Sequence, residues 1–210
     1  MPAAFSWSLF QKMPVIGILR NILPLHSETI ADLYFECGFT TLEITMNSPG
    51  AAATISSLSE RFADKLNIGA GTVCTLEDLE EAVSAGASFI VTPVLSEEVI
   101  KAAVIKNIPI FPGAFTPSEI YRAWMLGASM VKVFPATALG PGFIKDILAP
   151  LPYLKLIPTG GVSMNNFNSF LQAGAAGVGV GSTLFPANLI KEEKWDKLSE
   201  LFLRFKHSIS

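Results

Sequence analysis

Eight short runs rich in β-branched and aromatic residues alternate with longer stretches of helical pattern along this chain of 210 residues. Strands that alternate with helices favour a parallel sheet, and eight such units close into a barrel. The runs cover residues 14–19, 40–45, 66–70, 88–92, 108–111, 130–134, 155–158 and 177–180. The sequence therefore predicts an α/β fold, the (β/α)8 or TIM barrel.

The stretches between the runs carry apolar residues at i, i+3 and i+4, which is typical of helices packed on a sheet. Thr75 and Thr116 stand where helix N-caps are expected, each with an acidic residue close behind. Glycines that suit a left-handed helix end follow the predicted helices at Gly38, Gly86, Gly127 and Gly174.

Nothing in the composition divides the chain, because it contains no linker, low-complexity stretch or shift in residue usage. We expect a single domain over residues 1–210, since barrels of this length are common. Residues 1–11 hold several aromatic side chains but no basic or long apolar segment. We expect them to form a short helix that closes the lower mouth of the barrel, with no signal peptide and no membrane span.

Charge and cysteine content narrow the class of partner. The net charge is -3, and no cluster of Lys and Arg exceeds a pair, so we expect no nucleic-acid partner. A small molecule is the favoured partner. Cys37 and Cys74 lack the spacing of a redox or zinc motif. This cysteine usage favours a reduced, cytoplasmic setting.

Lys132 is a lone cation within the predicted strand at residues 130–134. Strand side chains alternate, so Lys132 shares a face with Met130 and Phe134, opposite Val131 and Val133. Desolvation among apolar neighbours favours the neutral amine, which attacks carbonyl carbons. The other interpretation of Lys132 is a strand lysine whose ammonium reaches solvent.

Glu43 is the second candidate for a catalytic group. Thr41, Glu43 and Thr45 share one face of a predicted strand, opposite Leu42 and Ile44. Polar side chains near the carboxyl ends of barrel strands form the reactive site in this architecture. Glu43 therefore points to the same interior as Lys132, either as a proton-transfer group or as the partner in a structural ion pair. The other polar residues near strand ends are Arg20, Thr45, Thr72 and Thr92.

Glycine pairs lie at the ends of the seventh and eighth predicted strands, at Gly160–Gly161 and at Gly179 and Gly181. Glycine lets backbone N–H groups approach an anion, and barrels commonly bind phosphate at these two loops. We therefore predict a phosphate site there. His26 and His207 lie in helical stretches, and no group of His, Cys and carboxylates has metal-ligand spacing, so we predict no metal site.

The chain resembles the bacterial 2-keto-3-deoxy-6-phosphogluconate aldolases and their 6-phosphogalactonate counterparts, which are class I aldolases. The resemblance covers nearly the whole length. The motifs that carry it lie at residues 14–20, 42–45, 69–73, 90–93, 111–113, 131–135, 158–162 and 179–182.

The resemblance implies an aldolase that uses no cofactor and acts on a phosphorylated keto sugar acid, with pyruvate and D-glyceraldehyde 3-phosphate as products. Lys132 would form the Schiff base and Glu43 would shuttle protons. Thr72 and Arg20 would hold the pyruvyl carboxylate in a pocket lined by Pro93 and Phe134. The residues implied for phosphate binding are Gly160, Gly161, Gly181 and Ser182.

The segment after Glu43 departs from part of the family. Where some members have Leu-Arg-Thr, this chain has Met46-Asn47-Ser48-Pro49, so Arg20 would have to supply the cation. This segment is similar to that of the phosphogalactonate enzymes. The configuration of the substrate at C4, and activity on 4-hydroxy-2-oxoglutarate, stay open at this stage.

Two other functions fit the barrel and its glycine loops. A phosphate-binding isomerase or epimerase would need paired acid and base groups or a metal, and the sequence offers one strong carboxylate near a strand end. A non-catalytic phosphosugar-binding barrel would use Lys132 only to neutralise an acid. The resemblance also implies a homotrimer. Trp124 and Met125 are candidates either for the subunit contact or for packing of their helix against the barrel.

Overall fold

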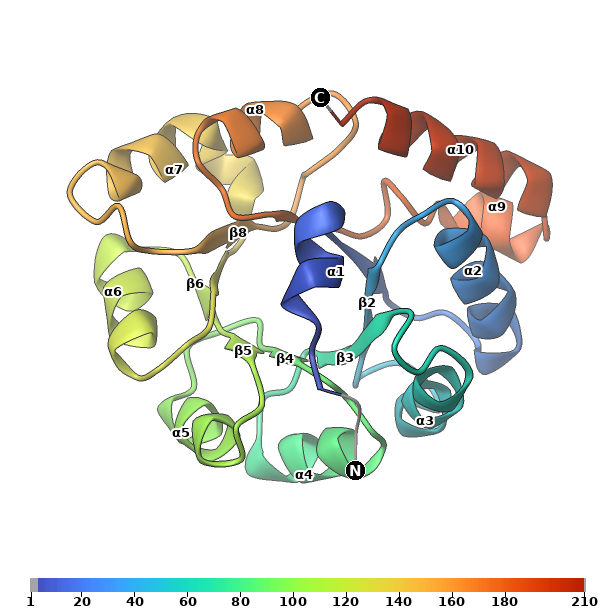
Figure 1. The fold of residues 1–210 in the computed structure, drawn as a ribbon, viewed down its shortest axis with the longest axis horizontal. Helices are drawn as coiled ribbons and strands as arrows, with labels where there is room; N and C mark the ends of the chain where they lie inside the picture. The colour runs from blue at the N-terminus through green and yellow to red at the C-terminus, as the bar shows by residue number, and fades with distance from the viewer. Residues whose placement is uncertain (1–3, 210) are drawn as a thin grey trace.

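The computed structural model describes residues 4–209, which form a ring of parallel strands surrounded by helices (Figure 1). The predicted barrel is confirmed. Its strands are β1 (Val15–Leu19), β2 (Thr41–Thr45), β3 (Asn67–Gly71), β4 (Ile90–Val91), β5 (Ile110–Phe111), β6 (Gly113–Ala114), β7 (Val131–Val133), β8 (Leu156–Pro158) and β9 (Val178–Val180). Its helices are α1 (Trp7–Lys12), α2 (Pro24–Glu36), α3 (Ala51–Arg61), α4 (Leu76–Ser84), α5 (Glu97–Ile105), α6 (Pro117–Met125), η1 (Ala136–Ala138), α7 (Gly140–Leu148), α8 (Phe167–Gln172), α9 (Ala187–Lys191) and α10 (Trp195–His207).

The strands pair in the order β5-β4-β3-β2-β1-β9, and β6-β7-β8 complete the ring. A bridge between Thr159 and Gly179 links the end of β8 to β9. The fifth strand differs from the prediction of residues 108–111, because it continues past Pro112: β5 before the proline pairs with β4, and β6 after it pairs with β7. Proline has no N–H to donate, so the ladder is interrupted there. Its carbonyl still accepts a hydrogen bond from the backbone N–H of Lys132 at 2.9 Å.

Two apolar layers hold the barrel together. The larger layer lies between the strands and the helices and includes Leu42, Ile44, Val131 and Val133. A smaller cluster fills the interior and includes side chains from β1, β4 and β5. Alternation along each strand divides the side chains between these layers. The predicted outward faces of β2 and β7 are therefore confirmed.

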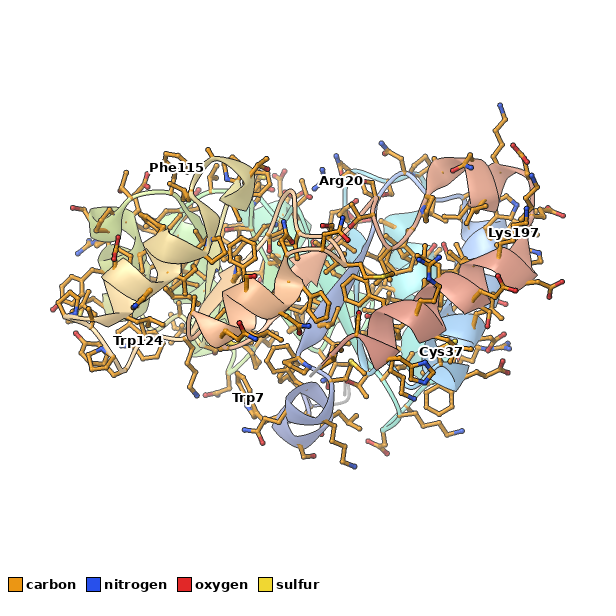
Figure 2. The ribbon with its side chains drawn as sticks, turned by 90° about the horizontal axis from the view of Figure 1, so that it is seen from above. Trp7, Arg20, Cys37, Phe115, Trp124 and Lys197 are labelled. Carbon is orange, nitrogen blue, oxygen red and sulfur yellow. The ribbon has the colours of Figure 1, made fainter. Side chains whose placement is uncertain are left out.

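Helix α1 lies across the centre of the ring in Figure 1, as predicted for residues 1–11, of which 1–3 lie outside the described residues. Phe5 and Phe10 from this segment belong to the interior cluster. The ring centroid of Phe5 lies 5.3 Å from that of Phe89, which stacks on Phe111 at 5.4 Å. In the side view, Trp7 lies at the α1 end and Arg20 at the opposite end (Figure 2). The aromatic rings thus plug one end of the barrel.

The predicted helix ends are also confirmed. Thr75 and Thr116 each form a capping box, in which the threonine hydroxyl accepts the N–H of the third helical residue. Gly38, Gly86, Gly127 and Gly174 have φ angles of 88°, 95°, 97° and 99°, in the left-handed region that ends a helix. Within residues 4–209, no helix is long and apolar enough to cross a membrane.

Candidate active site

Lys132 lies at the centre of β7, with its side chain inside the barrel and only 3% exposed. Its Nζ atom lies 5.0 Å from the centroid of the Phe134 ring. Burial lowers the pKa of the Lys132 ammonium below its ordinary value, the positive charge of Arg20 lowers it further, and the carboxylate of Glu43 opposes both. The interpretation of Lys132 as a strand lysine whose ammonium reaches solvent is therefore wrong, because the amine is enclosed.

Glu43 lies in the middle of β2 rather than at its end, and its side chain is 1% exposed. Burial raises the pKa of its carboxyl group, while the positive charges of Lys132 and then Arg20 lower it. Its Oε1 atom has no hydrogen-bond partner among the described residues. An unpartnered buried carboxylate oxygen is costly for stability, and such groups are common at reactive sites.

A cavity of about 430 Å³ opens at the end of the barrel away from α1. Ile18 of β1 and the loops that follow β1, β7, β8 and β9 supply its lining. Predicted site residues make up part of this lining, namely Arg20, Phe134, Gly160, Gly161, Gly181 and Ser182. Phe134 connects the cavity to Lys132, because it lines the cavity and contacts the Lys132 ammonium.

The loop after β8 has a fixed shape. Gly160 and Gly161 have φ angles of 90° and 74°, which side-chain-bearing residues rarely adopt. The Asn166 side-chain amide donates to the carbonyl of Gly161 at 2.9 Å, and the Thr183 hydroxyl donates to the carbonyl of Val162 at 2.7 Å. A hydrogen bond therefore holds the loop after β8 against the loop after β9, which suits the binding of a compact anion such as phosphate.

Comparison with known proteins decides the family. The model of the KDPG and KHG aldolase family matches residues 8–201. The chain belongs to the KDPG and KHG aldolase family. It is 37% identical to the 2-dehydro-3-deoxy-6-phosphogalactonate aldolase of Escherichia coli (84% of this chain, 86% of the relative). It is 38% identical to the 2-dehydro-3-deoxy-phosphogluconate aldolase of Haemophilus influenzae (90% and 88%).

A solved structure of the family adds a chemical observation. The KDPG aldolase from Legionella pneumophila, with pyruvate captured at low pH as a covalent carbinolamine intermediate, is 32% identical. It superimposes with a TM-score of 0.87 over 93% of this chain and 95% of that chain. A carbinolamine is the adduct that forms when an amine adds to a carbonyl carbon, and it precedes an imine. That member of the family thus binds pyruvate covalently, and this chain is a carbon–carbon lyase of the same family.

Four predicted site residues are absent from the lining of the cavity, namely Lys132, Glu43, Thr72 and Pro93, although Lys132 contacts Phe134 of that lining. Thr72 follows β3 with a φ angle of 57°, next to Gly71, and is half-buried. Pro93 follows β4, and its carbonyl lies against Gly113, the register partner of Lys132. Their roles toward the substrate stay predictions.

Other residues of the aldolase site were missed from the sequence. Asn21, Thr159 and Thr183 line the cavity beside the predicted residues. Thr159 directly follows β8 and precedes the Gly160–Gly161 pair, so its polar side chain at a strand end was a usable signal. Asn21 has a φ angle of 55°, a conformation in which asparagine is enriched. Its position follows from tertiary contacts, which the sequence does not display.

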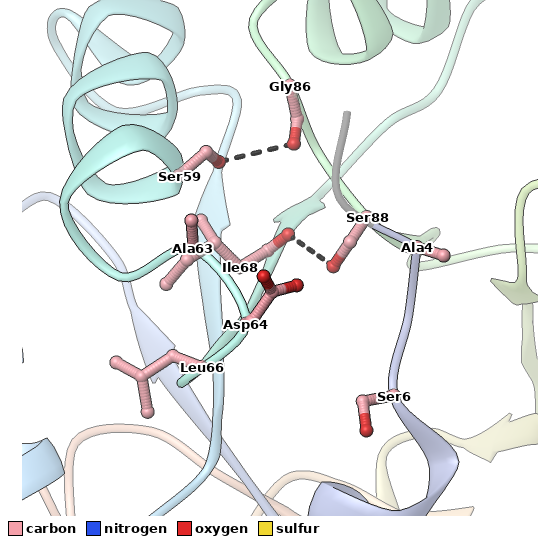
Figure 3. A pocket seen from close by; sticks show the side chains of 9 residues that line it. All are labelled: Ala4, Ser6, Ser59, Ala63, Asp64, Leu66, Ile68, Gly86 and Ser88. Carbon is pink, nitrogen blue, oxygen red and sulfur yellow. Dashed lines mark hydrogen bonds between the residues drawn. The ribbon is translucent and has the colours of Figure 1, made fainter. Parts of the chain in front are cut away.

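A second cavity of about 180 Å³ lies between the N-terminal segment, α3 and the start of β4 (Figure 3). Ser59 donates a hydrogen bond to the carbonyl of Gly86 at 3.2 Å, and Ser88 donates to that of Ile68 at 2.8 Å. Two of its hydroxyl groups are therefore already used within the protein. The predicted site residues lie elsewhere.

Proposed function

We propose that this aldolase cleaves a 2-keto-3-deoxy-6-phospho sugar acid to pyruvate and D-glyceraldehyde 3-phosphate through an imine on Lys132. The observation that carries the proposal is the burial of the Lys132 amine against the ring of Phe134, which lines the cavity, since burial lowers the pKa of the amine and raises its neutral fraction. A neutral amine is the form that adds to a ketone.

The reaction begins when the Lys132 nitrogen adds to the C2 ketone and the carbinolamine loses water. The resulting protonated imine accepts the electron pair of the C3–C4 bond as that bond breaks. Glu43 takes the proton of the C4 hydroxyl, which becomes the aldehyde oxygen of glyceraldehyde 3-phosphate. The enamine left on Lys132 is protonated at C3, and water then releases pyruvate and restores the free amine.

The remaining residues bind the two ends of the substrate. Arg20, with Thr72, would neutralise the pyruvyl carboxylate, while Phe134 and Pro93 would enclose the carbon chain. The phosphate would bind against the backbone of the glycine loops, where Gly160, Gly161, Gly181 and Ser182 lie. Contacts remote from the reacting carbons hold the substrate in the reactive geometry.

Borohydride reduction of the protein with pyruvate tests this proposal. The wild-type chain should gain an irreversible mass, and Lys132→Ala should gain none. Lys145→Ala removes an exposed lysine from α7 and should label like the wild type. Equal labelling of Lys132→Ala would refute the assignment. Labelling also separates an imine-forming aldolase from an isomerase or a binding barrel.

The configuration of the substrate at C4 needs its own measurement. The relatives of comparable identity include both phosphogalactonate and phosphogluconate aldolases. The proposal covers both C4 epimers, and the ratio of kcat/KM for the two epimers identifies the natural one. Unphosphorylated 4-hydroxy-2-oxoglutarate is the third substrate to compare, because it lacks the group that the glycine loops would bind.

We further propose that the single barrel domain assembles into a homotrimer in the cytoplasm. Exposed apolar side chains on two neighbouring helices support this assembly, with Ile105 of α5 80% exposed and Met125 of α6 63% exposed. Trp124 instead packs partly against the core. The unpaired Cys37 and Cys74 suit a reducing compartment. Light scattering should give a trimer mass for the wild type and a lower mass for Ile105→Glu/Met125→Glu.

A further inference from the structure

We propose that Gly71 is a positioning residue of the aldolase, because its missing side chain leaves the space that the Glu43 carboxyl group occupies. The functional part of this inference rests on the role proposed above for Glu43. Gly71 would not touch the substrate, and it acts only through the placement of that carboxyl group.

The pairing of β2 with β3 sets the two residues side by side. Glu43 is the register partner of Gly69, and Thr45 is the partner of Gly71. A Cβ atom added at Gly71 would lie 1.7 Å from Oε1 of Glu43, 2.4 Å from its Cδ and 2.7 Å from its Cγ. No side chain can share that space, so any residue other than glycine at position 71 displaces the carboxyl group.

The backbone gives no other reason for glycine at this position. Gly71 is absent from the glycines with positive φ, in contrast to Gly160 and Gly161 of the cavity. Alanine would therefore fit the main chain of β3. The carboxyl group lies at the end of a flexible but enclosed side chain, because Glu43 is 1% exposed, so a methyl group at position 71 would force it into another rotamer. Space for Glu43 is the remaining explanation.

Gly69 provides the matched comparison. It lies two residues earlier on the same strand and faces the same interior, but a Cβ atom there would meet the Phe89 ring at 2.4 Å. Phe89 belongs to the apolar cluster that fills the barrel. The two interior glycines of β3 thus serve different neighbours, one a packed ring and the other a carboxylate.

A double-mutant cycle in urea unfolding tests the steric relationship. Gly71→Ala should lower the unfolding midpoint of the wild type, and most of that loss should vanish in the Glu43→Ala background, where the added methyl group fills vacated space. Gly69→Ala should lower the unfolding midpoint by the same amount in the wild-type and Glu43→Ala backgrounds. The inference would be overturned if Gly71→Ala lowered the unfolding midpoint equally in both backgrounds. If Gly71→Ala alone fails to fold, folding of Gly71→Ala/Glu43→Ala supports the inference and its failure overturns it.

Exchange of the pyruvate methyl protons in D₂O tests whether Gly71 places the Glu43 carboxyl group for proton transfer. Borohydride trapping separately reports whether Lys132 still forms an imine. Gly71→Ala should lower exchange by roughly 10² to 10⁴-fold, the loss expected for a displaced acid–base group, and should still trap pyruvate. Gly142→Ala is the control, because no atom lies within 4 Å of its added Cβ. Glu43→Gln separates the two proposals. Normal exchange in Glu43→Gln refutes the role of Glu43, whereas normal exchange in Gly71→Ala alone refutes only the role of Gly71.

Discussion

The hydroxyl oxygen of Ser48 accepts a hydrogen bond from the backbone N–H of Asn21 at 2.9 Å and so ties the segment after β2 to the loop after β1. Ser48 also shares a hydrogen bond of 2.8 Å with the hydroxyl of Thr45. Both serine contacts are shielded, since Ser48 is 8% exposed. Asn21 follows Arg20 directly, so this contact fixes the backbone that carries the Arg20 side chain at the cavity.

Ser48→Ala should therefore weaken substrate binding more than it slows the chemical step. The loss of a shielded hydrogen bond costs about 1 kcal/mol, so we expect KM to rise about fivefold with kcat within about twofold. Steady-state kinetics on the preferred epimer measures both. Ser57→Ala on α3 removes an exposed hydroxyl that contacts Glu28, and it should leave both constants unchanged. A fall in kcat with unchanged KM would contradict this role of Ser48.

The two charges near Lys132 should shift its titration in opposite directions. Glu43 raises the pKa of the Lys132 ammonium, so Glu43→Gln should move it down, whereas Arg20 lowers that pKa, so Arg20→Met should move it up. In the wild type, the titration midpoint of the Lys132 ammonium should lie below the ordinary value of 10.5, because burial disfavours the charged form. The second-order rate of cyanoborohydride trapping at subsaturating pyruvate, measured against pH, reports the midpoint of the free amine in all three proteins. Shifts of the same sign in the two variants would contradict the electrostatic account.

Gly181→Ala should impair recognition of the phosphate without disturbing the fold. A Cβ atom there has Ile18 as its nearest neighbour at 3.9 Å, so it fits the protein, yet Gly181 lines the cavity. A methyl group in the anion site should cost at least one charged hydrogen bond, which corresponds to a loss of about tenfold or more in kcat/KM on the phosphorylated substrate. Trapping of pyruvate, which has no phosphate, should be unchanged. Gly142→Ala is again the control, and full activity of Gly181→Ala would place the phosphate elsewhere.

The sequence predicts those features of the aldolase that depend on local pattern. Alternation along 130–134 places Lys132 between two outward valines, and the structure has Val131 and Val133 in the outer layer. The same reasoning places Glu43 in the interior. Periodicity and chain order therefore suffice for the barrel and for the faces of its catalytic candidates.

Features that depend on contacts between distant segments could not be predicted. The hydrogen bond between Ser48 and Asn21 joins residues 27 positions apart, and nothing in either local sequence indicates it. The split of the fifth strand at Pro112 depends on which neighbour each half meets. A glycine such as Gly71 looks like any strand glycine until the side chain beside it is known. Tertiary packing, rather than propensity, determines these positions.

Replacement of the two buried charges should stabilise the aldolase while it abolishes catalysis. Burial raises the pKa of Glu43, so its stabilising contribution is present below the unfolded-state pKa and is lost as pH rises through the folded-state pKa. Burial lowers the pKa of Lys132, so its contribution is present above the unfolded-state pKa and is lost as pH falls through the folded-state pKa. The ionised form of each group is therefore costly in the folded barrel.

Glu43→Gln/Lys132→Met removes both charges at nearly constant volume. It should raise the free energy of unfolding at neutral pH by about 1 to 4 kcal/mol, the gain found where buried charged groups are replaced by well-packed neutral residues. Lys132→Met alone should be less stable than the double variant, because it leaves the Glu43 carboxylate without the opposing charge. Urea unfolding of the three proteins at matched concentration measures these differences. A double variant less stable than the wild type would mean that the two charges stabilise the barrel rather than strain it for catalysis.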